Sequence, residues 1–308
     1  MSARARRIFA VSLLFAPLCS CISTIRGPEL ALEYYNLGNA YYELGRYDKA
    51  ILFYEKAISI DRENRKAYYN LALVLIEAGR AAEAEPVLQD LLVQDPDNQS
   101  LQEALAFSYY AQQKNEQAIE IYERIVVRSP ENNKALYNLG IVLWKQDMLE
   151  SALAAFSAVL ENDPEDLEAL YNQGRLFLEL NLPEQSVEVL ERYLQQRPDE
   201  AEAYKLLGDG YRLLERYDRA LDAYAEALTY DEGLAEAWFY SAFIRLARIE
   251  DPDRGLTDLS QALSAGFKDE EKLRELLDSP DLLERERVTA LLERNGLLPP
   301  ALQEGGGG

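Results

Sequence analysis

The chain has 308 residues, of which 48% are hydrophobic and 28% charged, a composition typical of folded proteins and not of disordered or collagen-like ones. It carries 54 acidic against 32 basic residues, no histidine and only two cysteines. The missing histidine excludes the commonest general base and most zinc and triad sites, and the acidity disfavours contact with phosphates. We therefore expect no metal, no cofactor and no nucleic-acid partner.

The first 20 residues have the pattern of an export signal. Three arginines precede an uncharged run over residues 8–25, whose apolar centre is short and interrupted by Pro17. A spanning helix needs about 20 predominantly apolar residues, so this run indicates a signal peptide over residues 1–20.

The segment Leu18-Cys19-Ser20-Cys21 resembles the lipobox of bacterial lipoproteins, with Cys19 as a departure where a small residue is usual. The resemblance implies cleavage before Cys21 and its acylation, followed by a tether over residues 21–30. Ile22 after the acceptor implies sorting to the outer membrane, with the protein facing the periplasm, rather than retention at the inner membrane. Ordinary secretion and an uncleaved anchor stay open as alternatives.

From residue 31 the sequence repeats with a period of 34 residues, and only the seventh unit needs one extra residue, before Gly255. Self-similarity at this period indicates an array of helical hairpins. Prolines at position 32 of four units mark where a second helix ends. The predicted units are residues 31–64, 65–98, 99–132, 133–166, 167–200, 201–234 and 235–267.

Two positions of the unit hold small residues and two hold large ones. Glycine, alanine or serine occupies positions 8 and 20, as at Gly38 and Ala50, which lets the two helices of a hairpin cross closely. Large residues dominate positions 4 and 24, as at Tyr34 and Tyr54. We predict that these large side chains form the core.

This pattern resembles the tetratricopeptide repeat, and the first unit is close to that family's consensus. The resemblance implies an all-α fold, an α-solenoid of helix-turn-helix repeats wound as a right-handed superhelix. Residues 268–296 are expected to form two capping helices, with Ser279 capping the last one and Pro280 at its first position. Residues 297–308 are expected to form a flexible tail.

The family resemblance also implies that the first helices line a concave groove. The positions facing it hold a row of asparagines, many aromatic residues and a locally basic group in the fourth and fifth units. Whether the asparagines hold a peptide backbone or are only consensus residues stays open. The predicted partner-binding residues are Asn36, Asn70, Tyr69, Phe107, Tyr110, Lys134, Tyr137, Asn138, Trp144, Lys145, Tyr171, Asn172 and Arg175.

These features predict a non-catalytic scaffold, anchored to a membrane, whose groove binds a peptide or helix of partner proteins in the assembly or maintenance of cell-envelope complexes. The alternative is a periplasmic binding protein for a solute or glycan, or a carboxylate-based enzyme accessory. An enzyme of that kind needs a buried carboxylate with a perturbed pKa in a pocket, and the repeats account for almost every residue without one.

Overall fold

The computed structural model describes residues 27–297. The expected signal peptide, the expected lipid acceptor Cys21 and the expected tail from residue 298 onward lie outside the described residues. Within the described range the chain forms sixteen α-helices and no strand. No helix in this range combines the length and the apolar character that a bilayer crossing requires.

The chain divides into two compact units, Met1–Ala111 and Gln112–Gly308, so the boundary lies inside the third predicted repeat. Each repeat in a solenoid contacts only its neighbours, so no single core runs through such a chain. The first unit contains α1 (Gly27–Glu43), α2 (Tyr47–Ile60), α3 (Arg65–Glu77), α4 (Ala81–Gln94) and α5 (Gln99–Ala111). The second contains α6 (Asn115–Arg128), α7 (Asn133–Lys145), α8 (Leu149–Asn162), α9 (Leu167–Glu179), α10 (Pro183–Gln196), α11 (Ala201–Leu213), α12 (Tyr217–Tyr230), α13 (Ala235–Ala247), α14 (Pro252–Ser264), α15 (Glu270–Asp278) and α16 (Arg285–Arg294).

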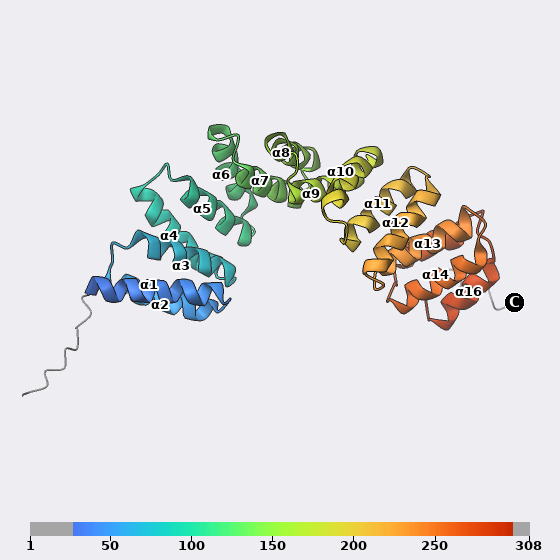
Figure 1. Ribbon diagram of the computed structural model, residues 1–308, viewed down its shortest axis with the longest axis horizontal. Coiled ribbons are helices and arrows are strands. Elements are labelled where there is room, and N and C mark those ends of the chain that lie inside the picture. The colour runs from blue at the N-terminus through green and yellow to red at the C-terminus, as the bar shows by residue number, and fades with distance from the viewer. Residues whose placement is uncertain (1–26, 298–308) are drawn as a thin grey trace, which may run out of the picture. The chain divides into compact units, whose positions relative to one another are not determined.

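Consecutive helices pack as hairpins within each unit, for example α1 with α2 and α13 with α14 (Figure 1). From the second repeat to the seventh, the first helix begins at the residue where the 34-residue period starts a new unit. α14 begins at Pro252, one residue later than the period alone would place it. The expected all-α fold of stacked helical hairpins is confirmed, while its superhelical handedness stays a prediction.

The close crossing within a hairpin explains the small residue at position 8. A Cβ atom added to Gly38 would lie 2.6 Å from the ring of Tyr54, and one added to Gly208 would lie 2.5 Å from the ring of Tyr224. Both tyrosine rings are buried. Position 8 therefore packs directly against the large residue at position 24.

Two expected boundaries are wrong. α1 begins at Gly27, so residues 27–30 belong to a helix and not to the tether; proline and glutamate in the first turn favour this earlier start. The last helix begins at Arg285, because Ser279 instead follows the final residue of α15.

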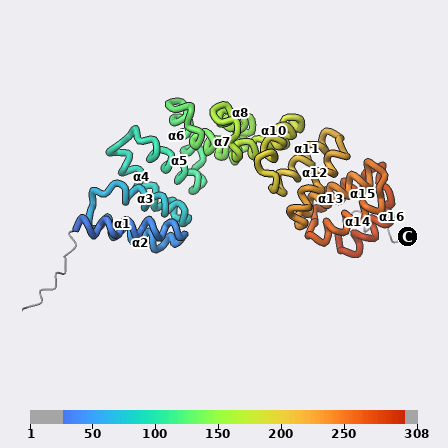
Figure 2. Tube along the Cα trace, in the orientation of Figure 1, coloured from blue at the N-terminus to red at the C-terminus, as the bar shows by residue number. Residues whose placement is uncertain are grey.

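Residues 279–284 form a turn that tertiary contacts hold in place. The backbone N–H of Leu283 donates to the carbonyl oxygen of Leu246 at 2.9 Å. The guanidinium of Arg285 donates to the carbonyl oxygen of Ser279 at 2.8 Å and also to that of Leu277. α15 before this turn and α16 after it lie side by side and cover the seventh repeat (Figure 2).

Candidate functional site

The second unit contains a pocket of about 660 Å³. Its walls come from the first helices of three successive repeats, α9, α11 and α13, and from α15. Four basic and four acidic side chains line it together with aromatic and apolar ones: Tyr171, Arg175, Leu178, Glu179, Glu202, Lys205, Leu206, Asp209, Arg212, Leu213, Glu236, Tyr240 and Lys272. Over residues 27–297, no group of three or more His, Cys, Asp or Glu residues is placed to hold a metal ion.

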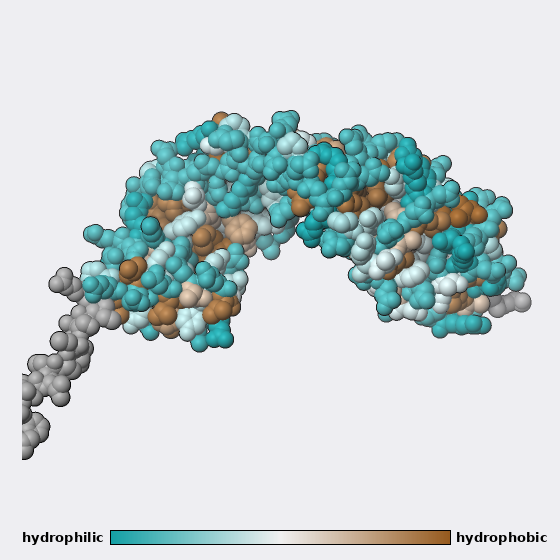
Figure 3. Space-filling model, in the orientation of Figure 1, coloured by the Kyte–Doolittle hydropathy of each residue, from teal (hydrophilic) through white to brown (hydrophobic). Residues whose placement is uncertain are grey.

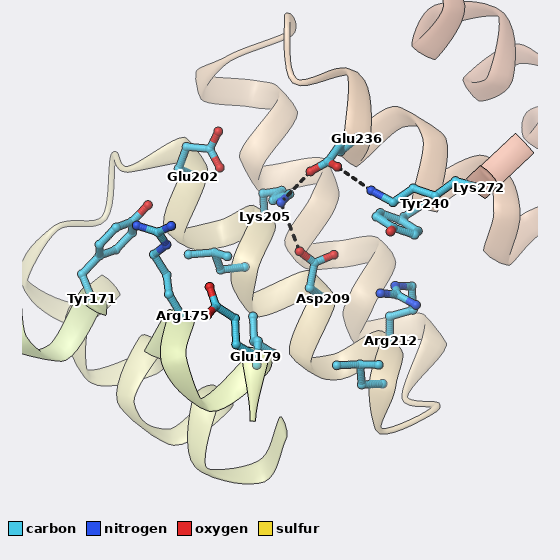
Figure 4. A pocket seen from close by; sticks show the side chains of 13 residues that line it. Tyr171, Arg175, Glu179, Glu202, Lys205, Asp209, Arg212, Glu236, Tyr240 and Lys272 are labelled. Atoms are coloured by element: carbon cyan, nitrogen blue, oxygen red, sulfur yellow. Dashed lines mark hydrogen bonds and ion pairs between the residues drawn. The ribbon is translucent and has the colours of Figure 1, made fainter. Parts of the chain in front are cut away.

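An ion-pair network crosses the pocket from α11 to α15 (Figure 4). The carboxylate of Glu236 lies 2.8 Å from Nζ of Lys205 and 2.7 Å from Nζ of Lys272. Nζ of Lys205 also lies 3.3 Å from the carboxylate of Asp209. Both ammonium groups of the pocket are therefore paired with carboxylates of the protein.

The network shifts the ionisation of its members. Burial disfavours the charge on Glu236, but hydrogen bonds from Lys205 and Lys272 outweigh burial and lower its pKa to about 2. Burial likewise opposes the charge on the two lysines, but the attraction of Asp209 and a hydrogen bond to Glu236 raise the pKa of Lys205. A hydrogen bond to Glu236 and the attraction of Tyr240 raise the pKa of Lys272. Glu236, Lys205 and Lys272 are therefore charged at neutral pH.

Arg212 lies on the pocket wall beside Tyr240. Its guanidinium centre is 4.1 Å from the ring centroid of Tyr240, and its Nε atom is buried without a hydrogen-bond partner. Burial lowers the pKa of Arg212, but Tyr224 and Asp209 outweigh burial and raise it above the usual value. Arg212 therefore keeps its charge and leaves one buried N–H donor unused.

Arg175 lies on the α9 side of the same pocket (Figure 4). Its guanidinium centre is 4.8 Å from the ring centroid of Trp144 and 6.0 Å from that of Tyr171. The indole N–H of Trp144 donates to Oε2 of Glu179 at 2.7 Å. Trp144 is not one of the residues that line the pocket, so its contact with the pocket runs through Arg175 and Glu179.

Two asparagines of the predicted row connect residues inside the protein. Nδ2 of Asn70 donates to the hydroxyl of Tyr35 at 3.1 Å and to Oδ1 of Asn39 at 3.0 Å. Nδ2 of Asn172 donates to the hydroxyl of Tyr137 at 2.9 Å and to the carbonyl oxygen of Glu168 at 3.0 Å. Both N–H groups of each amide are thus used within the protein, and the same asparagine-to-tyrosine link between neighbouring repeats occurs in both units.

The other predicted residues of the first unit lie at separate places. Tyr69 lines a pocket of about 330 Å³ between α3 and α5, and Asn70 lines one of about 290 Å³ between α1 and α3. Phe107 and Tyr110 of α5 contact each other with ring centroids 6.2 Å apart. Asn36 is exposed on α1.

The remaining predicted residues of the second unit lie on α7 and α9. Lys134 and Lys145 are exposed, whereas Asn138 and Tyr137 are half-buried. Burial and the nearby charge of Glu168 raise the pKa of Tyr137. Of the whole predicted set, the larger pocket gathers only Tyr171 and Arg175. The binding role of the set stays a prediction.

The pocket also contains residues that we did not single out from the sequence. Four of them occupy groove-facing positions of the sixth and seventh repeats: Lys205, Asp209, Arg212 and Glu236. Their positions in the repeat could therefore have identified them. No sequence pattern pointed to Lys272, because α15 lies beyond the repeats. The side chain of Lys272 reaches the pocket only through the tertiary fold.

Comparisons with known proteins agree with this architecture. The family model of the cytochrome c-type biogenesis protein H TPR domain matches residues 27–136. A tetratricopeptide repeat model matches residues 143–201 and 171–235. No curated protein matches the chain in sequence.

Several solved structures share the fold. A tetratricopeptide repeat protein from Parabacteroides merdae has 20% identity and a TM-score of 0.56, over 80% of this chain and 97% of that one. PilF from Pseudomonas aeruginosa has 19% identity and a TM-score of 0.59, over 70% of this chain and 98% of that one. MamA from Desulfovibrio magneticus RS-1 has 21% identity and a TM-score of 0.52, over 55% of this chain and 95% of that one. These likenesses show the shared fold. The family models, which together cover residues 27–136 and 143–235, show that the chain belongs to the tetratricopeptide repeat family.

Proposed function

We propose that this protein is a non-catalytic scaffold that binds a peptide segment of a partner protein in the pocket of the second unit. We further propose that acylated Cys21 anchors it at the bacterial envelope, where it helps to assemble complexes. The observation that carries the binding role is the pocket itself, since its volume of about 660 Å³ lies in the usual range of ligand sites. Three successive first helices line it, as the repeat pattern predicts for a groove.

The charges of the pocket indicate which peptides it binds. Lys205 and Lys272 are neutralised by carboxylates of the protein, whereas Arg175 and Arg212 lie against aromatic rings and pair with no carboxylate among the described residues. A guanidinium held by a ring is a preorganised planar donor for a carboxylate. A ligand carboxylate would also give the buried Nε of Arg212 its missing acceptor. The bound peptide therefore carries an aspartate or glutamate.

The direction of the pKa shift at Glu236 supports a binding role over catalysis. A carboxylate-based enzyme needs a pocket carboxyl with a raised pKa to serve as general acid. The pKa of Glu236 is lowered to about 2, because Lys205 and Lys272 outweigh the effect of burial. No observation in the pocket favours the alternative of a carboxylate-based enzyme accessory.

Selection from a random peptide library on the detergent-solubilised full chain tests the binding role. We expect peptides rich in aspartate and glutamate to be enriched, and Arg212→Gln and Arg175→Gln each to weaken their binding at least about tenfold. Arg254→Gln is the matched control, because Arg254 is largely exposed and does not line the pocket. Enrichment of peptides without acidic residues, or equal binding by all three variants, would contradict the proposed ligand.

Membrane fractionation tests the anchor. Cys21→Ala removes the proposed acyl acceptor, so the protein should move from the membrane fraction to another fraction. Cys19→Ala is the control, since it restores the small residue usual before the cleavage site and should leave the protein in the membrane fraction. If Cys21→Ala still sediments with membranes after a carbonate wash, the protein is not anchored through this residue.

A further inference from the structure

The first repeat exposes apolar side chains that the same positions bury in later repeats. Leu37, at position 7, is 40% exposed, whereas Leu71, Leu139 and Leu207 at the same position are 7–8% exposed. In the later repeats the second helix of the preceding repeat packs against this side, as α2 does against α3. No described helix precedes α1, so this side of the first repeat has no cover among the described residues.

The uncovered side forms a continuous surface, which we call the first-repeat outer face. Its members recur every three or four residues along each helix, so they share one side of the hairpin. They are Leu30, Tyr34, Leu37 and Tyr41 of α1, Leu44 directly after α1, and Lys49, Phe53, Lys56 and Ile60 of α2. Leu44 is 68% exposed, and none of the nine is fully buried. Figure 3 shows apolar patches amid hydrophilic surface over this part of the first unit.

Aromatic rings and lysines interlock on this face. Phe53 stacks with Tyr41 at 5.2 Å and with Tyr34 at 6.0 Å between ring centroids. Nζ of Lys56 lies 5.1 Å from the ring centroid of Phe53, and Nζ of Lys49 lies 5.1 Å from that of Tyr41. Two ammonium groups thus lie beside an aromatic and aliphatic surface.

The charge of this face is opposite to that of the chain. The whole sequence has a formal charge of −22, yet the nine residues of the first-repeat outer face include two lysines and no acidic residue. Three kinds of side chain favour the membrane interface: tyrosine rings, leucines, and lysines whose ammonium groups reach the anionic phosphates. A second copy of the face is disfavoured, because pairing two such faces would bring four lysines together.

The position of Cys21 brings this face near a bilayer. Residues 22–26 separate the proposed acyl acceptor from Gly27, the first residue of α1, so the step from Cys21 to Gly27 is six residues long. Six residues span at most about 20 Å even when fully extended. An acyl chain on Cys21 would therefore hold the start of α1, where the first-repeat outer face begins, within about 20 Å of the headgroups.

We propose that the first-repeat outer face lies on the lipid headgroup surface of the membrane that holds Cys21. The inference rests on the proposed acylation. The rings and leucines enter the interface while Lys49 and Lys56 contact lipid phosphates, so the bilayer covers the side that a preceding second helix covers in the later repeats.

A fluorescent probe at residue 37 tests this contact. The sequence has no cysteine after residue 21, so Leu37→Cys introduces one thiol for labelling. In the proposed lipoprotein the Cys21 sulfur is blocked by its acyl glyceryl group, and Cys19 is removed with the signal peptide. The labelled full chain is reconstituted into phosphatidylethanolamine and phosphatidylglycerol vesicles that carry a spin-labelled lipid. We expect the fluorescence at residue 37 to be quenched by about half, and a probe at Val93→Cys to be unaffected. Val93 is the matched control, because it is an aliphatic residue of the same unit and 81% exposed.

A second probe site and the vesicle-bound fraction separate the possible outcomes. Leu44→Cys repeats the measurement at a more exposed site of the same face, and circular dichroism checks that each labelled variant keeps its helicity. If the chain sediments with vesicles but neither probe is quenched, the inference is overturned while acylation stands. The inference is also overturned if both probes are shielded from a water-soluble quencher but are not quenched by the spin-labelled lipid. That result would mean that a second copy of the chain covers the face. If the chain does not sediment with vesicles, acylation and the inference both fail.

Discussion

Glu236→Gln would remove the carboxylate that joins Lys205 of α11 to Lys272 of α15, and with it the electrostatic link between the sixth repeat and the cap. A shift of one pKa unit corresponds to about 1.4 kcal/mol. The fall in the pKa of Glu236 from 4.5 to about 2 therefore sets an upper bound of about 3 kcal/mol on what its ion pairs contribute to the free energy of unfolding. The side chain of Glu236 is 42% exposed, however, and solvent screens both pairs. Ion pairs of this exposure contribute about 0.2–1 kcal/mol each, so we expect a loss of about 1–2 kcal/mol.

The pH dependence distinguishes this electrostatic effect from altered packing. Because the pKa of Glu236 is lower in the folded state than in the unfolded state, its stabilisation is complete above about pH 4.5 and is lost as the pH falls toward 2. The difference between wild type and Glu236→Gln should therefore shrink by about half or more at pH 3. Hydrogen exchange of the α15 amides, residues 270–278, measures the local effect, and urea denaturation followed by circular dichroism measures the global one.

Glu202→Gln is the matched control, because Glu202 lines the same pocket but forms no ion pair among the described residues. It should leave the protection of α15 unchanged. An equal loss of protection in both variants, or a Glu236→Gln effect of the same size at pH 7 and pH 3, would refute the electrostatic reasoning.

Three further substitutions test the packing and the pocket. Gly208→Val places a Cβ atom 2.5 Å from the buried ring of Tyr224, so urea denaturation should show a loss of about 1–3 kcal/mol. Glu215→Gly relieves a left-handed backbone of φ 56° and should stabilise the fold by about 0.5–1 kcal/mol by the same measure. Trp144→Ala removes the ring beneath Arg175 and should raise the Kd for acidic peptides about fivefold in fluorescence anisotropy, with helicity unchanged. An unchanged Kd would show that Trp144 does not position Arg175.

The repeat pattern located most helices because local signals end and begin them. A proline or a capping residue recurs at the joints with the 34-residue period, and α3, α7 and α11 begin where that period places them. The same signals misled at Ser279 and Pro280, which look like a helix start. There the contact of Leu283 with Leu246 holds a turn, and such a long-range contact leaves no local pattern.

The candidate site was only partly predictable. Arg175 and Tyr171 were identified because they occupy groove-facing positions in an aromatic and locally basic part of the array. Arg212 occupies a groove-facing position as well, but its value as a donor depends on the ring of Tyr240 beside it and on burial of its Nε atom. Neither condition can be derived from a position in a repeat.

The sequence by itself determined the all-helical fold and the repeat length, because helix periodicity and chain breakers act over a few residues. Only the tertiary structure decided which charges are neutralised and which remain available. Lys205 and Arg212 are both basic residues of α11, yet Glu236 and Lys272 from two other helices complete the network around Lys205 and leave Arg212 without a carboxylate partner among the described residues. Pairing depends on distances of 2.7 and 2.8 Å between charged atoms of different helices, and those distances exist only once the helices have packed.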